Sequence, residues 1–141
     1  ERELRARYEI SLERYIKDIT VEARLTQEIG RTLILPAVSQ AQGSLADTAL
    51  KLRQLDQPVD TSTLAEVSRL TVSLQEELNQ LAEISHEAEA HHACRADHAR
   101  YMREKVMPAM KRVRELADAL EGLVDDTLWP LPTYQELLFI R

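Results

Sequence analysis

Glycine and aromatic residues are scarce in this chain, and their scarcity narrows the fold class. Only three glycines occur in 141 residues, and aromatic residues make up 4% of the chain. Tight β-hairpin turns and phosphate-binding loops both depend on glycine. The sequence is rich instead in Ala, Leu, Glu and Arg, which favour helices. The composition therefore predicts an all-α fold, and the length suits a single domain covering residues 1–141.

The sequence is also short of cysteine, long apolar runs and positive charge, which limits where the protein is found and what it binds. The single cysteine, Cys94, cannot form an internal disulfide, which is typical of a reducing cytoplasm. No apolar run approaches the ~20 residues that a membrane-spanning helix needs. The net charge of −6 provides no excess of cations to neutralise phosphates. We therefore expect a cytoplasmic protein that binds neither nucleic acid nor membrane.

Small and apolar residues recur with alternating spacings of four and three along three segments. This pattern predicts helices over about residues 3–55, 62–91 and 94–124, each with one apolar stripe. Leu12, Ile16 and Ile19 begin the stripe of the first helix. A sustained seven-residue period is typical of helices that supercoil around one another. We expect an up-down-up bundle of three long helices.

The first predicted helix is much longer than the other two. Unbroken, it would span roughly 80 Å, about twice the length of each partner helix. If the helix ends near Leu55 and Val124 lie at one height, Leu12, Ile16 and Ile19 project beyond the bundle. We expect this uncovered stripe to pack on another domain or another copy of the chain.

Two prolines lie inside predicted helices. Pro36 interrupts the first and Pro108 the third, within the similar pieces 34–38 and 106–110. Proline has no N–H, so each should bend its helix and leave a carbonyl unpaired one turn earlier, at Thr32 and Glu104. With the helix ends at one height, the two prolines should lie side by side. The second helix should begin with a capping box, in which Glu66 and a threonine three residues earlier satisfy each other's backbone donors.

Residues 125–141 form a tail of different character. It holds the only Trp and the only Phe, with two of the five prolines. Pro130 and Pro132 should keep the chain extended. A second capping-box pattern at 133–136 predicts a short helix over about 134–139, which includes Phe139. We expect Trp129 to be buried against the helices, because an exposed cluster of this size would promote aggregation.

Candidate metal ligands are few and poorly arranged. Glu83 and His86, and Glu89 and His92, have the Glu-x-x-His spacing of di-iron bundles. Such sites need that motif on each of two helices, whereas here both fall on one. His91, Cys94 and His98 could share a helix face and hold zinc with a fourth ligand, but the spacing matches no zinc module. Solvated side chains at a helix end explain them better, so we expect no catalytic, cofactor or metal site in this chain.

Several segments resemble one known family. They are residues 7–19, 22–23, 34–37, 105–110, 117–126 and 128–132, of which the closing Trp-Pro-Leu-Pro stretch is the most specific. Together they resemble the carboxy-terminal helical domain of type III glutamine synthetases. The segment 86–98 matches no part of this pattern, so its histidines inherit no role.

The resemblance implies a parent enzyme that joins glutamate and ammonia using ATP, with magnesium or manganese. That chemistry would lie in a strand-rich catalytic domain upstream, none of whose motifs occurs here. This chain would then be a non-catalytic accessory domain, cut from a longer protein. It would pack on the catalytic domain of the same polypeptide or on a neighbouring subunit of a homo-oligomer. The alternative is a free-standing helical module for protein interaction. The expected structural or interface residues are Leu12, Ile16, Ile19, Pro36, Pro108, Trp129, Pro130, Pro132 and Phe139.

Overall fold

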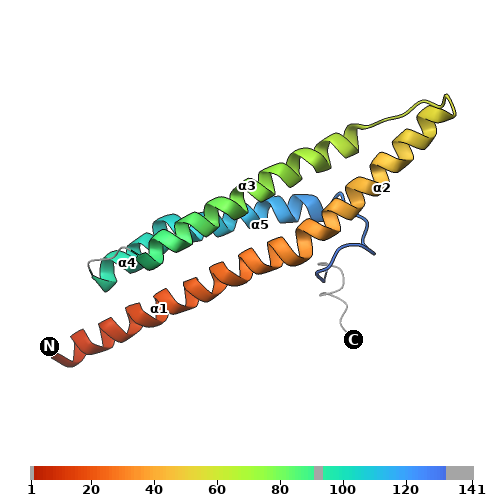
Figure 1. Ribbon diagram of the computed structural model, residues 1–141. Coiled ribbons are helices and arrows are strands. Elements are labelled where there is room, and N and C mark those ends of the chain that lie inside the picture. The colour runs from red at the N-terminus through yellow and green to blue at the C-terminus, as the bar shows by residue number, and fades with distance from the viewer. Residues whose placement is uncertain (1, 91–93, 133–141) are drawn as a thin grey trace, which may run out of the picture.

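A computed structural model describes residues 2–90 and 94–132 of the chain (Figure 1). The first helical segment consists of α1 (Arg2–Ile29), η1 (Gly30–Ile34) and α2 (Leu35–Gln54). The second is α3 (Ser62–Ala90), and the third consists of α4 (Arg95–Tyr101), η2 (Met102–Val106) and α5 (Met107–Glu121). These residues contain no strand, which confirms the all-α prediction for the part described. The third segment ends at Glu121, three residues earlier than expected.

Side-chain contacts fix the directions of the three segments. Arg24 pairs with Glu89 at 2.6 Å, and Gln42 donates to Ser68 at 3.0 Å, so α3 runs antiparallel to the first segment. The third segment runs parallel to the first, because α4 packs on the early turns of α1 and α5 approaches η1 farther along. Figure 1 shows the same course, with the chain rising through α1 and α2, returning through α3 and rising again.

One core runs through all three segments. Its most deeply buried large side chains come mainly from α3, which contacts both other segments. Their apolar surface stabilises the fold because burial removes it from water. The fully buried set is Leu74, Leu78, Leu81, Leu120, Val38, Val67 and Val106.

Both prolines follow a wide helical turn. The N–H of Leu35 donates to the Gly30 carbonyl, and the N–H of Met107 donates to the Met102 carbonyl. These i→i−5 bonds define the five-residue π-helices η1 and η2, and each ends two residues before its proline. A wide turn lets the helix continue past a residue that cannot donate a backbone hydrogen bond. The size of any bend at Pro36 stays a prediction.

The expectation that the two prolines lie side by side is wrong. Tyr15 donates to the sulfur of Met107 at 3.3 Å, which places Pro108 near the height of Tyr15. Pro36 lies about twenty residues farther along the first segment, which corresponds to roughly 20–30 Å along the helix axis. The assumption that the first and third segments end at one height is therefore wrong.

Loops rather than capping boxes organise the ends of α3 and α5. Asp60 Oδ1 accepts the N–H of Ser62 at 2.8 Å, so the start of α3 is capped from the preceding loop. Glu66 pairs instead with Arg69 at 2.7 Å, and the predicted capping box is therefore wrong. After α5, the Trp129 N–H donates to the Asp125 carbonyl at 3.1 Å, forming a turn that leads into the tail.

Candidate docking surfaces

The stripe expected to project beyond the bundle is covered. Ile19 is only 6% exposed, and Leu12 and Ile16 are half-buried. The third segment lies over this part of α1, since α4, η2 and α5 all pack on that helix. The prediction of an uncovered stripe at these three residues is therefore wrong. It failed because the third segment begins level with the early turns of α1, not near its middle.

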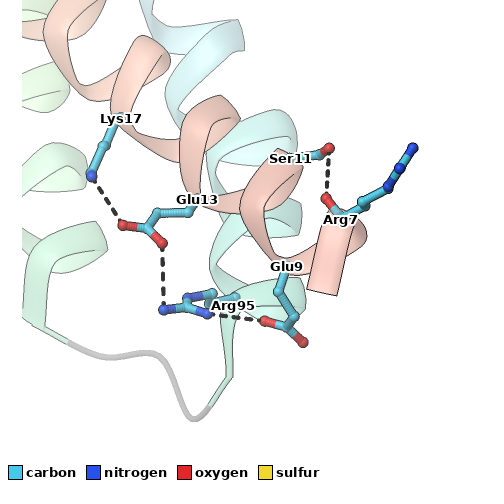
Figure 2. Close-up of polar contacts among 6 residues, drawn as sticks. All are labelled: Arg7, Glu9, Ser11, Glu13, Lys17 and Arg95. Atoms are coloured by element: carbon cyan, nitrogen blue, oxygen red, sulfur yellow. Dashed lines mark hydrogen bonds and ion pairs between the residues drawn. The ribbon is translucent and has the colours of Figure 1, made fainter. Parts of the chain in front are cut away.

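Ion pairs fix this register (Figure 2). Arg95, the first residue of α4, reaches Glu9 at 3.3 Å and Glu13 at 3.5 Å. Glu13 also accepts from Lys17 at 2.9 Å. The hydrogen bond from Lys17 lowers the pKa of the Glu13 carboxyl, and the charges of Lys17 and Arg95 lower it further. The pairs are exposed, so they specify the register more than they stabilise the fold.

Uncovered apolar side chains do occur earlier in α1. Leu4 is 73% exposed and Tyr8 is 55% exposed. They lie four residues apart on one face and continue the stripe that Leu12 belongs to. The first turns of α1 thus extend past the start of α4 with an apolar face in solvent.

The opposite end of the molecule is an arm of two helices. Because α5 ends near the height of η1, the third segment does not accompany most of α2 or the first turns of α3 (Figure 1). Leu50 and Leu55 are 58% and 69% exposed there. A shallow groove of about 420 Å³ lies between the two helices. Its lining is Ala46, Ala49, Leu50, Arg53, Thr61, Leu64 and Ala65.

A larger groove, of about 960 Å³, lies between α1 and α5. Leu25 and Ile29 line it from α1, and Met110 lines it from α5. The tail closes one end through Trp129 and Pro132. Charged residues such as Lys111 and Asp118 lie among the lining residues, but the surface is mainly apolar. We call this the α1–α5 groove.

Trp129 is buried at the end of this groove, as expected. Its side chain is 8% exposed and belongs to the core, with Leu128 and Leu131 packed against it. Pro130 and Pro132 are exposed. Phe139 and the short helix predicted over 134–139 lie outside the described residues. The tail is thus joined to the bundle through one large aromatic ring.

Two of the candidate metal ligands make other contacts. Glu89 pairs with Arg24, and the Cys94 thiol donates to Asp97 at 3.1 Å. Glu83 and His86 lie exposed on α3, while His91 and His92 fall outside the described residues. Within residues 2–90 and 94–132, no group of three or more His, Cys, Asp or Glu side chains is placed to hold a metal ion.

Sequence reasoning missed the arm and the α1–α5 groove. Both depend on the axial offset between the first and third segments, and periodicity does not report that offset. No sequence signal reports the offset, because the charges that set it, Arg95 with Glu9 and Glu13, cannot be recognised as partners before the fold is known. None of the described helices is long and apolar enough to cross a membrane.

Comparison with known proteins shows that this sequence is similar to glutamine synthetases. The family model for the glutamine synthetase C-terminal domain matches residues 1–53, which cover α1, η1 and nearly all of α2. The type-3 glutamine synthetase of Dictyostelium discoideum is 31% identical over 99% of this chain. The glutamine synthetase of Bacteroides fragilis is 26% identical over all of it.

The chain spans only 20% of the length of each of these relatives. The matches nevertheless extend beyond the family model and take in α3, α5 and the tail. These matches agree with the resemblance to type III glutamine synthetases, which is most specific in the Trp-Pro-Leu-Pro stretch. Nearly the whole chain is therefore similar to part of a type-3 glutamine synthetase, and its first 53 residues match the glutamine synthetase C-terminal domain.

Proposed function

We propose that this chain is a non-catalytic accessory domain of a glutamine synthetase. The observation that carries the proposal is the match of nearly the whole chain to a fifth of a type-3 enzyme. Most of that enzyme lies outside the matched part and can contain the catalytic site. The all-helical fold also supports the proposal, because the described residues offer neither a Gly-rich phosphate loop nor a metal-binding cluster.

The parent enzyme would make glutamine from glutamate, ammonia and ATP. ATP and a divalent metal, magnesium or manganese, would be bound in its catalytic domain and not by this chain. We expect the parent to be a cytoplasmic homo-oligomer. No residue described above is assigned a role in the reaction.

The arm is the surface we propose for docking the catalytic domain of the same polypeptide. Leu50 and Leu55 expose apolar surface where a third helix would complete the bundle, and the groove beside them is lined mostly by alanine and leucine. Small side chains allow a packed element to approach the backbone closely. This chain corresponds to 20% of the length of a type-3 enzyme, so the rest of such a polypeptide is the partner that we propose for the arm.

The domain would act through its rigidity. In this proposal the three segments form one up-down-up bundle, the turns at Pro36 and Pro108 curve it, and the extended tail holds its far end. A rigid body of this length can fix the position of the arm relative to the catalytic domain.

The isolated chain tests the non-catalytic assignment. We expect the purified 141-residue protein neither to bind ATP nor to form γ-glutamyl hydroxamate, because the residues for both lie elsewhere. ATP binding is measured by calorimetry and hydroxamate formation by its colour reaction. Turnover that disappears when Glu89 or His91 is substituted would overturn the assignment.

Substitutions in the full-length parent test the arm. L50D combined with L55D places two charges in the proposed interface, so we expect weaker assembly and lower glutamine production. I10D is the matched control, because Ile10 is 66% exposed and lies on α1, far from the arm. Wild-type assembly and activity in the L50D/L55D enzyme would contradict docking through this surface. Loss of assembly with full activity in the remaining monomer would instead assign the arm to a neighbouring subunit.

A further inference from the structure

We propose that residues 133–141 of this chain occupy the α1–α5 groove. This inference concerns the chain itself and does not depend on the proposed function. The groove is a mainly apolar surface that none of the described residues fills, and the segment directly follows the tail residues that line it.

Continuity of the chain is the first argument. Pro132, the last described residue, itself lines the groove, together with Leu131 and Trp129. Trp129 is 8% exposed and holds this part of the tail in the core. The segment that follows Pro132 therefore needs no long loop to reach the groove, so its entry would cost little loop entropy.

The composition of the segment is the second argument. Its sequence is Thr-Tyr-Gln-Glu-Leu-Leu-Phe-Ile-Arg, in which five of nine residues are apolar or aromatic. Tyr134, Leu137 and Leu138 have the spacing of one helix face, and Thr133 with Glu136 forms a capping-box pattern. Left in water, such a short apolar cluster would be a site of association.

The groove matches that segment in size and chemistry. Nine helical residues span about 13 Å, less than the roughly 20 Å length of α5 along the groove. The volume of about 960 Å³ accommodates several side chains. Leu25 and Met107, on opposite walls, are 49% and 41% exposed, and an occupant would remove this apolar surface from water.

Charged groups at the rim fit the polar residues of the segment. Lys111 and Arg114 lie on α5, where they could meet Glu136. Glu22, on α1, and Asp118 could meet Arg141. The segment therefore offers apolar residues for the walls of the groove and one charge of each sign for its edges.

A spin label on the segment tests the proposal in the full 141-residue chain. The label is attached to Q135C in a C94S background, because Gln135 is polar and the native cysteine is exposed. We expect loss of the methyl signals of Ile29, Met110 and Val113, which line the groove. The methyl signals of Leu64 and Val67, at the far end of α3, should remain.

Two variants and one mixing experiment make the outcome decisive. L138D should restore the groove signals without changing those of Leu64 and Val67, whereas L55D, on the arm, should leave the pattern unchanged. Retention of the groove signals in the labelled wild-type sequence would overturn the proposal. So would loss of the groove signals in isotope-labelled chains without a spin label when they are mixed with spin-labelled chains, because a second copy would then fill the groove.

Discussion

Trp129 is the residue through which the tail is joined to the bundle. We expect W129A to lower the free energy of unfolding by roughly 3–5 kcal/mol, because a buried aromatic ring would be replaced by a cavity. Urea denaturation followed by circular dichroism measures the change. Y8A is the control, since Tyr8 is 55% exposed and its loss should change stability by no more than about 0.5 kcal/mol. Equal changes in the free energy of unfolding for W129A and Y8A would show that the Trp129 ring stabilises the fold no more than an exposed side chain does.

Two glycines inside helices, Gly30 and Gly43, have opposite surroundings. A Cβ at Gly30 would lie 2.7 Å from Cδ2 of Leu78, whose side chain is 1% exposed, whereas a Cβ at Gly43 meets nothing within 4 Å. Alanine gains about 0.5–1 kcal/mol over glycine inside a helix. We expect G43A to stabilise by that amount. G30A should destabilise by about 1 kcal/mol, because overpacking in a tight core outweighs the gain.

Thermal unfolding of the two glycine variants checks the opposite signs. Stabilisation by both would mean that Leu78 shifts aside at little cost. Adding L78V to G30A should recover part of the loss if the clash is its cause.

Acidic residues in the loops make the ends of α3 and α5 sensitive to pH. The backbone hydrogen bond from Ser62 holds the pKa of Asp60 below its ordinary value of 3.8. Hydrogen bonds from the side chain and then the backbone of Thr127 do the same for the pKa of Asp125. A carboxylate with a lowered folded pKa stabilises above its unfolded pKa, and this contribution is lost as pH falls through the folded value.

We therefore expect the melting temperature to fall between about pH 5 and pH 3, with part of the fall due to these two carboxylates. D60N and D125N should melt below the wild type near neutral pH, and the difference should shrink as the solution is acidified. Melting curves across this range measure it. A constant difference at every pH would contradict a role for the two charges.

The sequence predicted the elements well, because periodicity and loop residues report local structure. The stripe through Leu74, Leu78 and Leu81 is buried as expected, and α3 begins at Ser62, where the helix was predicted to start. The wide turns before Pro36 and Pro108 were not predicted. A missing N–H is visible in a sequence, but the choice between a broken bond and an i→i−5 bond depends on how neighbouring side chains pack.

At the scale of the whole molecule, the offset between segments creates regions of different stability. The arm has two helices, whereas η1 and the second half of α1 contact both α3 and the third segment. Regions with fewer buried apolar contacts open more easily. We expect amide hydrogens in the second half of α2 and the first turns of α3 to exchange faster than those of α5. Hydrogen-exchange mass spectrometry measures this, and uniform protection would contradict it.

This offset could not be predicted from the sequence alone. Heptad patterns fix which face of each helix is buried, but sliding one helix along another by seven residues keeps the same faces in contact. The ion pairs of Arg95 with Glu9 and Glu13, together with Trp129 beside the core, select one register. The apolar face of Leu12 was therefore identified correctly, while its covering by the third segment was not.

The wide turns have a consequence for how the chain tolerates insertions and deletions. A π-turn holds one residue more than the α-helical turn it replaces, so its removal need not rotate the flanking helices. Deleting exposed Lys105 together with P108A should therefore close η2 into regular α-helix and preserve the fold. Because α3 has no π-turn to absorb the change, deleting exposed Arg69 should rotate one end of that helix by about 100° and unfold the protein. We therefore expect this domain to accept single-residue changes of length at two places inside helices, η1 and η2, as well as in its loops.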